Sequence, residues 1–129
     1  MRLLLDTHVF LWLLAEPERL GGHMSSLEDL GNQLLFSAAS SWEIAIKVQV
    51  GRLELPDDPK RYVPDRMRAI GVEPLAVEHN HALAVGQLPH LHRDPFDRLL
   101  VAQARDLRLC IVTADARIAR YEVPTLLIS

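Results

Sequence analysis

Short apolar runs without alternation constrain the fold of this chain most strongly. Residues 3–5, 34–36 and 109–113 are apolar at nearly every position, and residues 72–75 and 125–128 are weaker runs of the same kind. Strands of this composition are typical of parallel sheets that are covered by helices on both faces. Because helical patterns separate the runs, the sequence predicts the α/β class, a three-layer α/β/α sandwich with a central, mostly parallel sheet.

Capping residues and helix breakers delimit the helices between these runs. We expect Ser40 and Ser41 to cap one helix, which Gly51 ends, and Pro95 to occupy the first turn of another, which runs to Asp106. The other predicted helices cover residues 7–15, 23–30, 60–70, 78–85 and 115–120.

Length and composition set wide limits on function. The 129 residues predict a single domain, 1–129. The net charge of −3 argues against charge-driven coating of nucleic acid but not against an acidic metal site. Cys110 is the only cysteine, so no internal disulfide forms and a cytoplasmic location is expected. The longest apolar run, Val9–Ala15, is too short to span a membrane.

Acidic residues stand near the carboxyl ends of predicted strands or near the start of helices. Because the carboxyl ends of parallel strands share one edge of a sheet, we expect these side chains to converge there. Each acid alone is equally compatible with capping a helix or with complementing a helix dipole; Glu43, for example, is expected in the first turn of its helix. The acids are Asp6, Glu43, Asp94, Asp97 and Asp115.

Convergence of these carboxylates predicts a divalent-cation site. Carboxylates gathered in an apolar sheet repel one another at a cost of several kcal/mol, and a bound cation removes that cost. Hard oxygen ligands favour Mg²⁺ or Mn²⁺ over zinc. The sequence therefore predicts a Mg²⁺ or Mn²⁺ site at the carboxyl edge of the sheet.

Four segments resemble the PIN-domain family, and more narrowly the VapC-type toxins of bacterial toxin–antitoxin pairs. They are LLLDTH at 3–8, SAASSWEI at 37–44, DPFDRLLVAQA at 94–104 and TAD at 113–115. The start of the third segment, DPFDRLL, is the most specific. The resemblance implies a PIN-like fold and a metal-dependent ribonuclease that cleaves RNA phosphodiester bonds. It also implies a homodimer that a cognate antitoxin protein binds and silences.

The resemblance further implies roles for individual side chains. Asp6 and Asp97 are the direct metal ligands, and Asp115 holds a second metal or a metal-bound water, which attacks the RNA phosphate once deprotonated. Glu43 orients the attacking water. Supporting roles fall to Thr7, Asp94 and Thr113. The catalytic acids implied by the family pattern are Asp6, Glu43, Asp97 and Asp115.

Two other function classes remain open from the sequence. A haloacid-dehalogenase-like phosphotransferase also begins with an Asp at a strand end, but it needs a second Asp where this chain has His8. A non-catalytic receiver-like regulator needs a phospho-accepting Asp after the third strand, and the region around Leu75 has none.

Other residues admit two interpretations each. His92 lies two residues before Asp94 and belongs either to the rim of the site or to an ordinary loop. Trp12 and Trp42 occupy apolar positions of predicted helices, so we expect both in the core. One basic stretch is either an RNA-phosphate contact or a solvated helix face; it comprises Arg52, Lys60, Arg61, Arg66 and Arg68.

Overall fold

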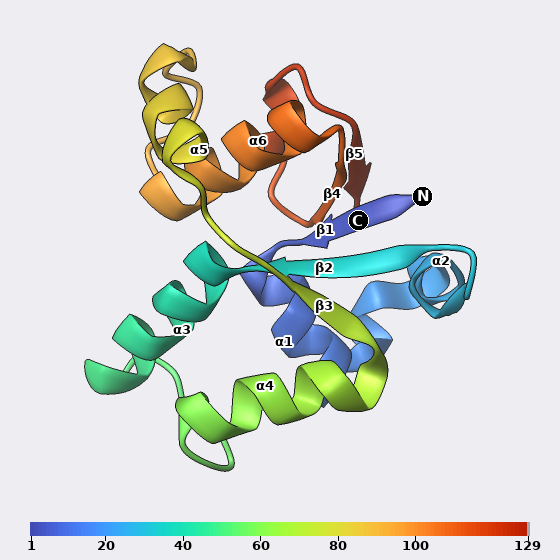
Figure 1. Ribbon diagram of the computed structural model, residues 1–129. Coiled ribbons are helices and arrows are strands. Elements are labelled where there is room, and N and C mark those ends of the chain that lie inside the picture. The colour runs from blue at the N-terminus through green and yellow to red at the C-terminus, as the bar shows by residue number, and fades with distance from the viewer. Residues whose placement is uncertain (129) are drawn as a thin grey trace.

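A single five-stranded sheet organises the computed structural model, which describes residues 1–128 (Figure 1). The strand order is β3-β2-β1-β4-β5, and every neighbouring pair is parallel. The chain therefore builds outward from β1 in both directions, which makes β1 the point where the strand order switches. The strands are β1 (Arg2–Leu5), β2 (Gln33–Ser37), β3 (Val72–Leu75), β4 (Cys110–Thr113) and β5 (Thr125–Leu127).

Helices cover both faces of this sheet, as Figure 1 shows with α1 and α4 below it and α5 and α6 above it. The predicted α/β/α sandwich is thus confirmed. Two local predictions need correction. The helix expected over 23–30 is shorter and follows a 3₁₀ segment at residues 17–23 that was not predicted, and the helix expected over 115–120 is a short 3₁₀ segment. The helices are α1 (Thr7–Ala15), α2 (Met24–Glu28), α3 (Ala38–Gln49), α4 (Pro59–Ile70), α5 (His79–Ala84) and α6 (Pro95–Leu107), and the 3₁₀ segments are η1 (Pro17–His23), η2 (Val85–Gln87) and η3 (Ile118–Arg120).

The two faces of each central strand feed two separate hydrophobic cores. Along β1, Leu3 and Leu5 pack with α1, α3 and α4, whereas Leu4 packs with α6. All three side chains are buried, because successive residues of a strand point to opposite faces and both faces are covered. The unalternated apolar runs of the sequence follow from this double burial.

Helix α3 begins three residues earlier than the sequence predicts. Ser37 is the N-cap, because its Oγ accepts the backbone N–H of Ala39 at 3.1 Å and also donates to Gln103 Oε1 at 2.6 Å. Ser40 lies inside the first turn, so the predicted cap at Ser40 and Ser41 is wrong. The earlier start moves Glu43 from the first turn of the helix into the second.

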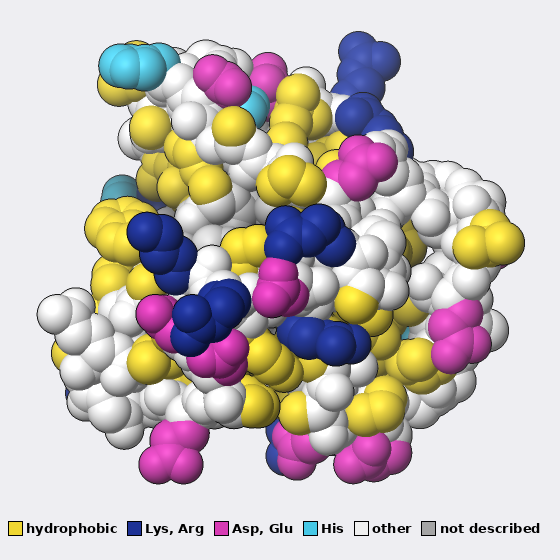
Figure 2. Space-filling model, turned by 60° about the horizontal axis from the view of Figure 1, so that its bottom comes forward, with side chains coloured by type: hydrophobic (Ala, Val, Ile, Leu, Met, Phe, Trp, Pro, Cys, Tyr) yellow, Lys and Arg dark blue, Asp and Glu magenta, His cyan; other side chains and the backbone are white. Residues whose placement is uncertain are grey.

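The basic stretch at 52–68 forms a solvated face with its own counterions. Arg61 pairs with Asp57, and Arg68 pairs with Asp65. Figure 2, in which the underside of Figure 1 comes forward, shows blue and magenta side chains close together among yellow ones. This pairing favours the solvated helix face over a continuous RNA-phosphate contact.

Within residues 1–128, no helix is both long and apolar enough to cross a membrane.

Replacing Ser37 by alanine should destabilise the fold. The variant loses the helix cap, worth about 1 kcal/mol, and leaves a buried Gln103 acceptor unpaired, worth about another 1 kcal/mol. Urea unfolding should show the free energy of unfolding lowered by about 2 kcal/mol.

Ser40→Ala is the matched control, since the buried Ser40 hydroxyl has no hydrogen-bond partner among residues 1–128. Its free energy of unfolding should be unchanged or slightly higher. A larger loss for Ser40→Ala than for Ser37→Ala would contradict the observed cap.

Candidate active site

The predicted site begins where β1 and β4 end side by side. Asp6 follows β1 as the N-cap of α1, with Oδ1 accepting the backbone N–H of His8 at 3.3 Å. Thr113, the last residue of β4, donates its hydroxyl to Asp6 Oδ2 at 2.6 Å and accepts the backbone N–H of Asp115 at 3.0 Å. One threonine therefore ties the two strand-end acids together at the point where the strand order switches.

Helix α3 supplies the third acid. Glu43 is 3% exposed, and Thr7 of α1 donates its hydroxyl to Glu43 Oε1 at 2.6 Å. The other oxygen, Oε2, accepts a hydrogen bond from Lys47 Nζ at 2.7 Å, one helical turn further along. Thr7 and Thr113 thus each donate a hydrogen bond to one of the predicted acids, Thr7 to Glu43 and Thr113 to Asp6.

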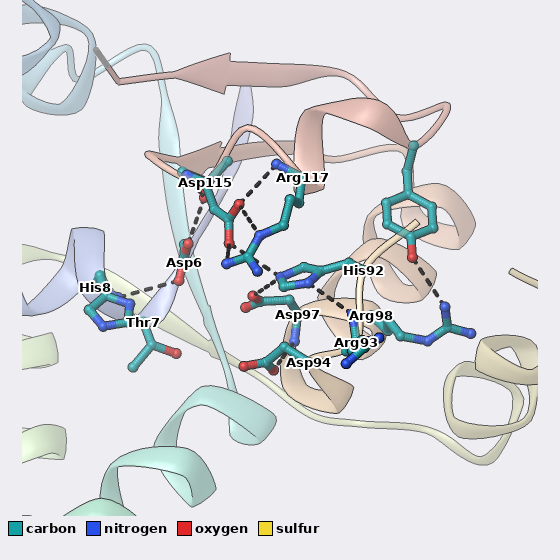
Figure 3. Close-up of polar contacts among 12 residues, drawn as sticks. Asp6, Thr7, His8, His92, Arg93, Asp94, Asp97, Arg98, Asp115 and Arg117 are labelled. Atoms are coloured by element: carbon teal, nitrogen blue, oxygen red, sulfur yellow. Dashed lines mark hydrogen bonds and ion pairs between the residues drawn. The ribbon is translucent and has the colours of Figure 1, made fainter. Parts of the chain in front are cut away.

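Helix α6 supplies the remaining two acids. Asp94 is its N-cap, with Oδ1 accepting the backbone N–H of Asp97 at 3.0 Å. Pro95 occupies the first turn as predicted. This cap directs the first turn of α6 toward the carboxyl edge of the sheet, where Asp97 faces Asp115 and His92 (Figure 3).

All five predicted acids meet in one cavity of about 410 Å³. His8, Trp12 and Arg117 complete much of the wall. Thr7 and Thr113 lie buried just behind it. The acids in its lining are Asp6, Glu43, Asp94, Asp97 and Asp115.

Negative charge is unbalanced in this cavity. Burial, reinforced by the neighbouring carboxylates, raises the pKa of Asp97 to about 8; these carboxylates belong to Asp6, Asp94, Glu43 and Asp115. Burial also raises the pKa of Asp6, against the hydrogen bond from the Thr113 hydroxyl. Without a cation, the folded protein therefore holds a proton on Asp97 at neutral pH.

Asp115 differs because it has its own cation. Arg117 donates from Nε to Oδ1 at 3.1 Å and from Nη2 to Oδ2 at 3.0 Å. These hydrogen bonds lower the pKa of Asp115, so this carboxyl is ionised at neutral pH.

Two neighbours of the acids were not assigned a role from the sequence, and a third, His92, was left between the rim of the site and an ordinary loop. The structure places His92 at the site. Lys47 stands four residues after Glu43, a spacing that signals a helical ion pair. Arg117 stands two residues after Asp115, and His92 reaches Asp97 from the preceding loop. The positions of Arg117 and His92 depend on loop conformation, which helical periodicity in the sequence does not predict.

One of the two tryptophans departs from prediction. Trp42 is 62% exposed and packs edge-on against Phe96, with ring centroids 5.3 Å apart. The predicted burial of Trp42 is wrong, because Trp42 lies two residues before the buried Ile44 and residues two apart do not share a helix face. Trp12 is partly buried, packs against the hydrophobic core on the α1 face of the sheet, and also lines the cavity.

The donor set fits a hard divalent cation. Carboxylate oxygens predominate, as Mg²⁺ and Mn²⁺ prefer, and no cysteine lies in the cavity lining. The raised pKa of Asp97 independently marks a place where positive charge is lacking. One ligand atom each from His92, Asp97 and Asp115 lies within 4.8 Å of the others.

Comparison with known proteins then places the chain in a family. A model described as PIN domain matches residues 3–124. The chain belongs to the PIN-domain family. This membership confirms the resemblance found in the sequence and removes the phosphotransferase and receiver-like alternatives.

Named relatives of this PIN domain come from Mycobacterium tuberculosis. Ribonuclease VapC22 is 30% identical over 124 residues, which cover 94% of this chain and 92% of that protein. Ribonuclease VapC16 is 51% identical over 55 residues, 43% of this chain and only 39% of that protein. Among solved structures, VapBC2 from Rickettsia felis bound to a promoter DNA fragment superposes with a TM-score of 0.75 at 14% identity, covering 100% of both chains.

Neutralising Asp97 should stabilise the metal-free PIN domain at alkaline pH. Below pH 3.8 the Asp97 carboxyl is protonated whether the chain is folded or unfolded, so it has no effect. As pH rises to about 8, only the unfolded chain ionises, and stability is progressively lost. In chelator near pH 8, Asp97→Asn should melt about 4 °C or more above wild type.

The difference between the two melting temperatures should shrink as pH falls, and it should vanish well below pH 3.8, where wild-type Asp97 is protonated in both states. A variant that melts below wild type near pH 8 would make Asp97 a structural residue and refute the unbalanced charge.

Proposed function

We propose that this PIN domain is a Mg²⁺- or Mn²⁺-dependent endoribonuclease, the toxin of a toxin–antitoxin pair. The proposal takes residues 1–129 as one domain and the cytoplasm as its location. The observation that carries it is the meeting of five carboxylates in one cavity at the switch point of the sheet. Family membership and the names of the two mycobacterial relatives supply the reaction type.

Within this proposal, Asp6, Asp97 and Asp115 hold the cation. A bound divalent cation supplies a water of lowered pKa and neutralises charge on the phosphoryl oxygens. Thr113, through its 2.6 Å hydrogen bond, and the backbone N–H of His8 fix the orientation of the Asp6 carboxylate, which lines the cavity. Asp94 supports the site by capping the helix that carries Asp97.

Glu43 completes the catalytic quartet from the side of α3. Its two oxygens already accept hydrogen bonds from Thr7 and Lys47, which hold the side chain in place. A carboxylate held in this way suits the orientation of an attacking water rather than a direct place on the metal.

Basic side chains border the acidic cavity without neutralising it. Arg117 lines the cavity and is 63% exposed, while its guanidinium holds Asp115. Lys47 is about one-third exposed beside Glu43. Both retain free donor positions for RNA phosphate oxygens, because each carries more N–H groups than its carboxylate uses.

RNA cleavage should stop in chelator and return when Mg²⁺ or Mn²⁺ is added, because the carboxylates alone do not generate a nucleophile. Asp97→Asn should lose at least about 100-fold in cleavage rate while remaining folded. The measurement is gel analysis of a labelled single-stranded RNA pool, with Asp57→Asn, on the distant solvated face, as the matched control. Full cleavage in excess chelator would refute the metal-dependent reaction.

The negative charge of the acidic cavity also indicates how a protein partner would bind there. An unfilled acidic cavity attracts a guanidinium or ammonium group, and a guanidinium satisfies two carboxylate oxygens at once. The proposal therefore includes a cognate antitoxin that inserts an Arg or Lys against Asp6 and Asp97, bound to a homodimer of this chain. The proposal seats the rest of this segment in an apolar groove between α3 and α4, which is lined in part by Ala45, Val63 and Met67. Helix α3 also contributes Glu43 to the acidic cavity.

Replacing the basic residue of the antitoxin segment by alanine should weaken inhibition of RNA cleavage by about tenfold or more, while leaving antitoxin folding unchanged. Titration of the purified toxin with each antitoxin variant measures this. A complex whose structure leaves the acidic cavity open, yet still inhibits, would contradict the proposal.

A further inference from the structure

The loop before α6 places a histidine against two of the acids. His92 Nε2 lies 2.7 Å from Asp97 Oδ2 and 3.2 Å from Asp115 Oδ2. The His92 side chain is only 4% exposed. Figure 3 shows the imidazole between these carboxylates, which come from α6 and from the segment after β4. His92 therefore contacts both the acid carried by α6, Asp97, and the acid that follows β4, Asp115.

The backbone fixes which ring nitrogen carries the proton. The N–H of Arg93 donates to His92 Nδ1 at 3.0 Å, so Nδ1 presents a lone pair. A neutral imidazole with an accepting Nδ1 carries its proton on Nε2. The nitrogen that faces Asp97 and Asp115 is consequently a donor and has no lone pair to offer a metal, although its position among the acids resembles that of a ligand.

The loop that carries His92 is itself anchored to α6. Arg98, next to Asp97, is 8% exposed and donates to the carbonyl oxygens of Val85 and Pro89, each at 3.0 Å, and to the Tyr121 hydroxyl at 3.1 Å. Its buried guanidinium thereby fixes the preceding loop relative to the helix. This anchoring lets one hydrogen bond from the loop set the position of the Asp97 carboxylate.

We propose that His92 is a positioning residue, whose Nε2–H bonds to Asp97 beside Asp115 and thereby keeps the two carboxylates in the arrangement that binds the cation. The inference rests on the proposed metal site and adds the residue that organises it. Hydrogen-bonding partners of metal-binding carboxylates typically contribute 10- to 100-fold to metal affinity. His92 acts through the acids and stays off the metal.

Two substitutions separate the two ring nitrogens. In His92→Gln the side-chain NH₂ takes the place of Nε2 and still donates to the carboxylates. In His92→Asn the side-chain oxygen takes the place of Nδ1 and still accepts from Arg93, but no donor reaches Asp97. A role confined to loop structure predicts that Asn replaces histidine better than Gln does. The positioning role predicts the opposite order.

Mn²⁺ affinity without RNA provides the test, measured by the electron paramagnetic resonance signal of free Mn²⁺. We expect His92→Gln to bind within about threefold of wild type and His92→Asn to bind about tenfold or more weakly. Equal affinities, or better binding by the Asn variant, would overturn the inference while the metal site itself stands. Failure of wild type to bind Mn²⁺ would instead overturn the proposed metal site, and this inference with it.

Wild-type protein gives a second test that does not depend on how the variants fold. Nitrogen-15 NMR of the imidazole should find the proton on Nε2 both in chelator and with saturating Mg²⁺. A proton on Nδ1 in the Mg²⁺ form would make His92 a metal ligand and overturn its role as a donor.

Discussion

Repulsion among buried carboxylates at the end of β1 is the interaction around which this molecule is arranged. Asp6 and Glu43 are almost fully buried, and Asp97 is ionised only with difficulty. Two such charges about 5 Å apart repel by roughly 3 kcal/mol at an effective dielectric near 20. A cost of this size is a large fraction of the folding free energy of a single domain, and a bound cation would remove it.

Hydrogen bonds from several elements hold the carboxylates of this cluster in place. Thr113 supports Asp6 from β4, Thr7 supports Glu43 from α1, and Arg117 holds Asp115. Each donor comes from a different element than its acid, except for Arg117, which lies two residues away. The site therefore requires β1, β4, α1 and α3 to be in place together, and disturbance of any one of them displaces a carboxylate.

The sequence was enough to predict the sheet and the acids, because both depend on strong local signals. Apolar runs such as 3–5 mark doubly covered strands, and an acid at the end of a parallel strand can only lie at one edge. The start of α3 was mispredicted, because Ser37, Ser40 and Ser41 are equally good caps locally. Gln103, which comes from a distant helix, favours Ser37 through a buried hydrogen bond.

The sequence could not decide where a loop side chain such as His92 lies, because its position depends on contacts between distant residues. The position of His92 depends on Arg98, whose guanidinium binds carbonyl oxygens of residues 85–89 rather than a carboxylate. Neither the charge pattern nor the periodicity of the sequence predicts a contact between an arginine and backbone carbonyl oxygens. Arg98 looks like one more surface cation in the sequence, yet it is buried.

We propose that the converging carboxylates hold a divalent cation, and anomalous scattering from crystals of the protein alone, soaked in Mn²⁺, would locate it. We expect a Mn²⁺ peak in the acidic cavity with oxygens of Asp6 and Asp97 at about 2.1 Å and His92 outside the coordination sphere. An empty cavity at saturating Mn²⁺, or an ion held elsewhere on the surface, would refute the proposed metal site.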